Sequence, residues 1–231
     1  MQMKDRQVLL TGGSGGLGIG VAKVLLAQGA KLTLPVRSSK SGESLKQNLS
    51  AAERIEVVIS DLNNESSVTQ LVDNMERVDA LVHLVGGFSM GATHEYSFDD
   101  WEKDFALNVD TTFLLCKYSL AKMLKQGYGR IVTISSRGAL QPGAKIAAYS
   151  ASKAGVIALT QAIAEETKGT NITANIVLPS VIDTPKNREA MGAENAAQWV
   201  TPESLGGVIA FLVSEAAKDI RGAAIPVYGN T

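Results

Sequence analysis

A tyrosine and a lysine stand four positions apart in residues 148–168, a stretch whose apolar residues recur at helical spacing. This spacing places Tyr149 and Lys153 on one face of the expected helix. A neighbouring ammonium group favours the ionised form of a phenol, so the pair predicts that Lys153 lowers the pKa of Tyr149. A phenol with a lowered pKa can act as a general acid or base.

A serine is expected to lie near this pair. Ser136 comes directly after residues 130–135, an apolar run that is typical of a strand. Ligands of open α/β sheets bind at the carboxyl ends of the strands. The sequence therefore predicts that Ser136 and Tyr149 belong to one site.

A second candidate site is the glycine-rich segment of residues 11–18, which reads Thr-Gly-Gly-Ser-Gly-Gly-Leu-Gly. It follows the apolar run 7–10 and precedes the helical pattern of residues 18–28. In this context the backbone amides at the start of a helix approach a pyrophosphate, so the segment predicts a dinucleotide site. From the residues alone, the essential glycines are either Gly13, Gly15 and Gly18 or Gly12, Gly16 and Gly18.

The residues after the second apolar run indicate which dinucleotide binds. An acidic residue there would bind the ribose 2′-hydroxyl of NAD, whereas an arginine accommodates the 2′-phosphate of NADP. No Asp or Glu occurs in residues 6–42, and Arg37 and Ser38 follow the run 31–36. We therefore expect NADP(H) to be favoured over NAD(H), with Arg37 as a solvated strand end as the alternative.

The composition argues against several other classes of protein. The 231 residues include 22 Lys and Arg against 23 Asp and Glu, so no strong positive field is available for nucleic acid or an anionic membrane. One cysteine, Cys116, and two histidines predict no metal site. Without a signal peptide or an apolar stretch of membrane-spanning length, the expected location is the cytoplasm.

Short apolar runs alternate with helical patterns along the whole chain. The expected strands are residues 7–10, 31–36, 56–59, 80–85, 130–135, 172–178 and 224–227. The expected helices are residues 18–28, 98–126, 148–168 and 202–214. The polar, serine-rich residues 38–54 are interpreted as a solvated connection with room for a short helix at most. The pattern predicts an α/β fold, a doubly wound parallel sheet of about seven strands with helices on both faces, and a single domain over residues 1–231.

Taken together, these motifs resemble the short-chain dehydrogenase/reductase family, over essentially the whole chain. The resemblance rests on the order and spacing of Thr11-Gly-x-x-x-Gly-x-Gly18, Asp61-Leu62, Asn108, Ile134-Ser135-Ser136, Tyr149-x-x-x-Lys153, Pro179 to Pro185, and Ile225-Pro226-Val227. It implies the glycine register Gly12, Gly16 and Gly18.

The resemblance also implies hydride transfer between a nicotinamide and an alcohol or carbonyl. Tyr149 would then exchange the proton, Ser136 would stabilise the substrate oxygen, and Lys153 would hold the ribose and lower the pKa of Tyr149. Asn108 would interrupt its helix and hold a water of a proton relay. The expected cofactor-binding residues are Gly12, Ser14, Gly15, Gly16, Leu17, Gly18, Arg37, Ser38, Asp61, Leu62, Gly86, Tyr149, Lys153, Pro179, Ile182 and Thr184.

Three features depart from the family pattern: residues 83–86, Pro179-Ser180 in place of the usual Pro-Gly, and Gly15 where many NADP-dependent members have a basic residue. His83-Leu84-Val85-Gly86 stands where the family commonly has Asn-Asn-Ala-Gly, and we expect a variant packing there with His83 as a hydrogen-bonded strand-end residue. The implied substrates are small-molecule or carrier-bound carbonyls, such as a 3-oxoacyl thioester. The implied assembly is a homodimer or homotetramer. The alternative function is a sensor or scaffold that binds NADP(H) without turnover.

Overall fold

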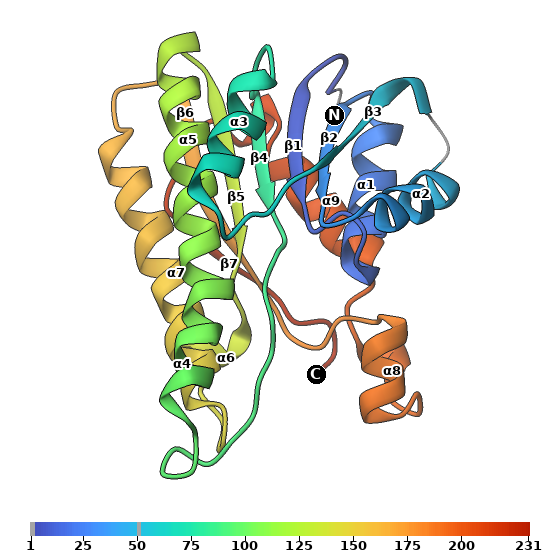
Figure 1. Ribbon diagram of the computed structural model, residues 1–231, viewed down its shortest axis with the longest axis vertical. Helices are drawn as coiled ribbons and strands as arrows, with labels where there is room; N and C mark the ends of the chain where they lie inside the picture. The colour runs from blue at the N-terminus through green and yellow to red at the C-terminus, as the bar shows by residue number, and fades with distance from the viewer. Residues whose placement is uncertain (1–2, 50–51) are drawn as a thin grey trace.

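The computed structural model describes residues 3–49 and 52–231, which form one seven-stranded parallel sheet with helices on both faces (Figure 1). The strands are β1 (Gln7–Thr11), β2 (Lys31–Val36), β3 (Ile55–Ile59), β4 (Ala80–His83), β5 (Gly129–Ile134), β6 (Ile172–Pro179) and β7 (Ala224–Val227). Their order in the sheet is β3-β2-β1-β4-β5-β6-β7. The predicted doubly wound fold is confirmed.

Helices connect successive strands. The α-helices are α1 (Gly16–Ala27), α2 (Ser39–Asn48), α3 (Glu65–Asn74), α4 (Phe98–Phe105), α5 (Thr111–Gln126), α6 (Arg137–Leu140), α7 (Ala147–Glu166), α8 (Pro185–Met191) and α9 (Pro202–Leu212). The shorter helical turns are η1 (Ala52–Arg54), η2 (Ala106–Asp110), η3 (Ala196–Gln198) and η4 (Glu215–Ala217). No helix in the described part of the chain is long and apolar enough to cross a membrane.

Two apolar layers hold the helices against the sheet. The side chains of α1, α2 and α9 pack against one face, where Val21, Leu45 and Ile209 are buried. The side chains of α3, α5 and α7 pack against the other face around Leu71 and Cys116. Every residue of β5 and β6 is buried, which explains why these strands are rich in Ile, Val and Leu.

The direction of winding changes between β1 and β4. From β1 the chain first builds outward through β2 and β3, and then crosses to the other side of β1 to build β4, β5, β6 and β7. Ligands of doubly wound sheets bind at this switch point, outside the carboxyl ends of the strands. The segments at this edge include the turn between β1 and α1, the loop after β4 and the start of α6.

The connection between β2 and β3 corrects one expectation. Residues 38–54 are not merely a solvated connection, because ten of them form α2 and bury Gly42 and Leu45. Ser38 begins this helix, since its hydroxyl oxygen accepts a hydrogen bond from the backbone N–H of Ser41. Helix α3, which the sequence pattern did not indicate, begins in the same way at Asn64.

The long helical pattern of residues 98–126 is interrupted, as expected. Helix α4 ends at Phe105, and η2 is a single π-helical turn that contains Asn108. Such turns insert one extra residue per turn and are common at functional sites. Helix α5 then continues to Gln126 and ends at Gly127, whose φ of 73° is favourable for glycine.

Candidate active site

The glycine-rich turn follows the Gly12, Gly16, Gly18 register. Gly12 has a φ of +71°, and a Cβ on Gly18 would lie 2.1 Å from the Gly12 carbonyl oxygen. A Cβ on Gly16 would lie 3.0 Å from the Cβ of Thr184. On Gly15 it would meet only the Gly12 oxygen, at 3.4 Å. Glycine is therefore required at Gly12 and Gly18, is favoured at Gly16 by the close approach of Thr184, and is not required at Gly15.

The start of α1 is open for an anion. Gly15 precedes the helix with no side-chain cap, and the first turn contains no acidic residue. The early backbone N–H groups of a helix have no partner within it, and the helix dipole adds positive potential there. This arrangement suits a pyrophosphate.

A cavity of about 480 Å³ lies beside this turn. Six of the expected cofactor residues line it, namely Gly12, Ser14, Gly15, Arg37, Leu62 and Gly86. Lining residues that the sequence reading missed include Ser41, Ser60, Asn63, Thr111 and Lys186. Gly16, Leu17, Gly18, Ser38, Asp61, Pro179, Ile182 and Thr184 do not line it, although Thr184 contacts the turn through Gly16.

The cavity's charged lining residues are cations. Arg37 and Lys186 line it, and no carboxylate does so among the described residues. Ser38, expected beside Arg37 as a phosphate ligand, uses its hydroxyl to begin α2. The Asp61 carboxylate accepts hydrogen bonds from the backbone and side-chain nitrogens of Asn63. The cavity therefore fits a ligand with several negative charges.

Ser136, Tyr149 and Lys153 come together at the end of β5. Ser136 lies immediately beyond the strand and begins α6, where its hydroxyl oxygen accepts a hydrogen bond from the Gly138 N–H at 3.1 Å, and it lies close enough to the Tyr149 phenol to lower the pKa of that group. Lys153, one turn further along α7, donates a hydrogen bond from Nζ to the Ile134 carbonyl oxygen at 3.1 Å. The three expected side chains thus share one site.

The pKa of Tyr149 differs from the expectation. Burial raises it, the hydrogen bond from Ser136 lowers it in part, and Lys153 is not among the causes. Burial also lowers the pKa of Lys153 to about 8. The spacing correctly placed the two groups on one helix, but it did not reveal that both are desolvated.

Asn108 connects three parts of this site. Its Oδ1 accepts a hydrogen bond from the Gly87 N–H at 2.9 Å, and its Nδ2 donates to Ser152 Oγ at 3.0 Å. Gly86 lies between Asn108 and Lys153, because a Cβ added to it would be 2.8 Å from Asn108 Oδ1 and 2.7 Å from Lys153 Nζ. A side chain at this position would displace the ends of both side chains. The π-helical turn therefore holds the loop after β4 against α7.

His83 is a fully buried strand-end residue, as expected. Its Nδ1 lies 2.9 Å from Thr11 Oγ1, and its Nε2 lies 3.3 Å from Thr111 Oγ1. Because Thr111 donates its own hydroxyl hydrogen to the Leu107 carbonyl, Nε2 must carry the proton and Nδ1 must accept. Burial and the nearby Lys153 charge lower the pKa of His83 to about 3, so the ring is neutral.

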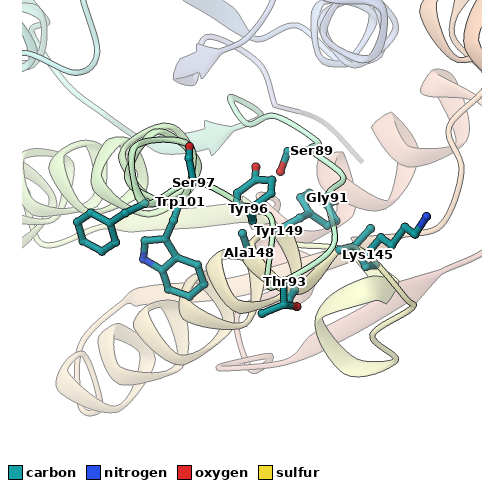
Figure 2. A pocket seen from close by; sticks show the side chains of 12 residues that line it. Ser89, Gly91, Thr93, Tyr96, Ser97, Trp101, Lys145, Ala148 and Tyr149 are labelled. Atoms are coloured by element: carbon teal, nitrogen blue, oxygen red, sulfur yellow. The ribbon is translucent and has the colours of Figure 1, made fainter.

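A second pocket, of about 190 Å³, lies beside Tyr149. Figure 2 shows Trp101 on one side of it and Tyr149 with Lys145 on the other. Its polar wall is held by Asp104, a buried carboxylate that accepts hydrogen bonds from Ser89 Oγ at 2.5 Å and Tyr96 Oη at 2.7 Å. The pocket can hold an organic group whose reactive atom reaches Tyr149.

Comparison with known proteins identifies the family. Residues 6–195 match the family model described as short chain dehydrogenase. The chain belongs to the short-chain dehydrogenase/reductase family. It is a nicotinamide-dependent oxidoreductase of the kind that acts on alcohol or carbonyl groups.

Two curated relatives of this short-chain dehydrogenase/reductase carry the names of specific enzymes. The chain is 33% identical to the 3-oxoacyl-[acyl-carrier-protein] reductase MabA of Mycobacterium tuberculosis, over 98% of this chain and 92% of MabA. It is 28% identical to the D-beta-hydroxybutyrate dehydrogenase of Cupriavidus necator, over 96% and 95% of the two chains.

Solved structures of other family members have the same fold. A short-chain type dehydrogenase/reductase from Mycobacterium ulcerans superposes with a TM-score of 0.92 at 27% identity, over 100% of this chain and 90% of that one. The structure of ElxO with NADP bound has a TM-score of 0.91 at 26% identity, over 97% and 98% of the two chains. The short-chain dehydrogenase/reductase fold expected from the sequence is confirmed.

Proposed function

We propose that the protein is an NADP(H)-dependent oxidoreductase that reduces a carbonyl group, with Ser136, Tyr149 and Lys153 at the reacting atoms. The observation that carries this proposal is the meeting of Ser136, Tyr149 and the buried Lys153 at the end of β5, next to a cavity whose charged lining residues are cations. NADP(H), when bound, supplies or accepts the hydride at the substrate carbon.

Tyr149 is the proposed proton donor. Its raised pKa keeps the phenol protonated at neutral pH, which is the form that gives a proton to a carbonyl oxygen. As the carbon gains the hydride, the oxygen gains this proton, so the product is an alcohol and Tyr149 is left as a phenolate. Ser136 donates a hydrogen bond to the same oxygen as its negative charge develops.

Lys153 has two proposed tasks. Its ammonium group stabilises the phenolate once that forms, and it contributes hydrogen bonds to the nicotinamide ribose. A pKa of about 8 also allows Lys153 to exchange protons close to neutral pH. Asn108, which meets Lys153 across Gly86, is the residue we assign to the relay that returns a proton from solvent.

The remaining proposed cofactor contacts come from residues that line the large cavity and from residues of the segments next to it. We assign the pyrophosphate to the backbone of Gly12, Ser14, Gly15, Gly16, Leu17 and Gly18, and the adenine side to Arg37, Ser38, Asp61 and Leu62. We assign the nicotinamide side to Gly86, Pro179, Ile182 and Thr184. Arg37, exposed at the end of β2, is the residue that favours the 2′-phosphate of NADP(H) over NAD(H).

The proposed substrate is a small-molecule or carrier-bound carbonyl. The pocket beside Tyr149 has aromatic side chains on one side, including Phe98 and Trp101, and these suit an apolar body. We further propose a cytoplasmic homodimer or homotetramer, which the exposed apolar side chains of Phe113 and Leu124 on α5 support.

The test compares Tyr149→Phe and Arg37→Ala with the unmodified protein. Nicotinamide fluorescence measures binding of NADPH and NADH, and absorbance follows reduction of a panel of ketones and 3-oxoacyl thioesters. Tyr149→Phe is expected to lower turnover at least about a hundredfold with NADPH binding unchanged, because the proton donor is lost. Arg37→Ala is expected to weaken NADPH binding and leave NADH binding as it was.

A different outcome would favour the alternative function. Tight NADPH binding by the unmodified protein with no turnover across the panel would indicate a sensor or scaffold. If the unmodified protein bound NADPH and NADH equally, only the proposed role of Arg37 would be contradicted, and the rest of the proposed function would stand.

A further inference from the structure

Lys186 is the second cation of the large cavity, and neither the glycine motif nor the catalytic motif includes it. It is the second residue of α8, whereas Arg37 follows β2. The cavity thus has one positive side chain from the β2–α2 connection and one from α8, with no carboxylate among its described lining residues.

The chain before Lys186 packs directly on the glycine-rich turn. A Cβ on Gly16 would lie 3.0 Å from the Cβ of Thr184 and 3.6 Å from the Cδ of Pro185. Lys186 follows these two residues and lines the same cavity as Ser14 and Gly15. It therefore lies near the open start of α1, where a pyrophosphate is expected.

The residues around Lys186 are held by their own contacts. The Thr184 hydroxyl oxygen accepts from the Asn187 N–H at 3.2 Å, and Asn187 Nδ2 donates to the Ile182 carbonyl at 2.8 Å. Arg188, the next cation of α8, is paired with Asp183 through two hydrogen bonds of 2.5 and 2.7 Å.

Lys186 itself is exposed, and it has no hydrogen bond or ion pair with any residue that the structure describes. Its backbone is fixed by its neighbours while its ammonium group stays available to a ligand. An unpaired cation on the wall of a cavity without carboxylates favours an anionic group.

We propose that Lys186 binds the pyrophosphate of the nicotinamide dinucleotide and so couples α8 to the bound cofactor. The inference rests on the proposed function and extends it by separating two tasks. Arg37 distinguishes NADP(H) from NAD(H), whereas Lys186 contacts a group that both dinucleotides carry. Its contribution to binding is therefore the same for both.

The experiment titrates NADPH and NADH separately into Lys186→Gln, Lys186→Arg and Arg37→Gln, at low and high salt, with nicotinamide fluorescence as the readout. Lys186→Gln is expected to raise both dissociation constants by the same factor, about tenfold, because one charged hydrogen bond is lost. It should also reduce the salt dependence of binding, since screening acts on charge pairs. Lys186→Arg should retain most of the affinity, and Arg37→Gln should weaken NADPH alone.

Lys46→Gln is the matched control, because Lys46 is an exposed lysine of α2 that does not line the cavity. This variant is expected to bind both nucleotides as the unmodified protein does. Unchanged affinity in Lys186→Gln, or a loss confined to NADPH, would overturn the inference while leaving the proposed function intact. An unmodified protein that binds neither nucleotide would overturn the proposed function, and this inference with it.

Discussion

Lys153 is buried without a carboxylate among its recorded hydrogen bonds and ion pairs. The residue is 5% exposed, and its ammonium group donates a hydrogen bond to a backbone carbonyl. Burial lowers the pKa of Lys153 from 10.5 to about 8. At neutral pH Lys153 is therefore protonated in both states, but its proton is bound more tightly in the unfolded chain than in the folded protein. This residue serves the proposed chemistry at a cost in stability.

Replacing Lys153 by Met is expected to stabilise the cofactor-free protein at pH 7 by about 2 to 3 kcal/mol, because a desolvated charge is removed. Since the unfolded chain binds more protons between pH 8 and 10.5, the stability that Lys153 subtracts returns as the pH rises through that range. Urea unfolding at pH 7 and pH 10 measures both effects.

The advantage of Lys153→Met over the unmodified protein should shrink at pH 10. Lys46→Met is the control, since an exposed lysine should show no such change. A Lys153→Met variant that is less stable at pH 7 would mean that the lost hydrogen bond to Ile134 outweighs the removed charge.

At this scale the sequence predicted which residues meet and not how their surroundings act on them. Tyr149, Lys153 and Ser136 were found from their spacing, because helical periodicity determines which side chains are neighbours. The direction of the Tyr149 pKa shift was wrong, because it depends on burial by distant segments. Lys186 was missed because α8 is short and carries no periodic apolar pattern.

The close packing of the turn between β1 and α1 determines which of its positions can carry a side chain. Gly12 and Gly18 touch so closely that no side chain fits on Gly18, whereas Gly15 faces open space on most sides. The four glycines at Gly12, Gly15, Gly16 and Gly18 are therefore not equivalent, although the printed sequence makes them look alike.

Gly18→Ala is expected to destabilise the protein by about 3 kcal/mol or more, because the added Cβ would lie 2.1 Å from the Gly12 oxygen. Gly15→Ala is the matched variant and should change the free energy of unfolding by less than about 0.5 kcal/mol. Chemical denaturation of both variants checks the difference. Similar losses in the two variants would contradict the glycine register described above.

Strands were the elements that the sequence located best, and both β2 and the partly buried β7 were predicted with their observed bounds. In β2 nearly all of the residues are buried. Helix α2 was passed over because only Gly42 and Leu45 of its ten residues are buried. The fourth strand was extended too far, because Leu84 and Val85 are apolar yet line the large cavity instead of continuing the sheet.

Over the whole molecule, the carboxyl and amino ends of the sheet differ in the groups that they hold. The two cavities of the candidate active site lie at the carboxyl end, while at the amino end Arg130 is fully buried and donates to the carbonyl oxygens of Gly129 and Asn171, both at 2.9 Å. Arg130 also reaches Glu215 at 3.3 Å, and its guanidinium stacks on Tyr128 at 4.4 Å. This cluster ties β5 to the segments that follow β6.

Arg130→Met is expected to destabilise the protein by about 3 kcal/mol or more, because the buried oxygens would lose their donor. Arg6→Met removes a partly exposed guanidinium that also contacts the Tyr128 ring and should cost about 1 kcal/mol or less. Thermal unfolding measures both. NADPH affinity should be unchanged in either variant, and a loss of affinity would show that the two ends of the sheet are coupled.

The reactivity of Cys116 can report how often the folded protein opens locally. It is the chain's single thiol, it lies on α5 in the apolar layer around Leu71 and is 1% exposed, and burial raises its pKa to about 12. The thiolate is the form that attacks thiol reagents, so these reagents can modify Cys116 only in molecules whose apolar layer on this face has opened. The rate of labelling in native buffer thus measures, without denaturant or an introduced tag, how often that half of the protein comes apart.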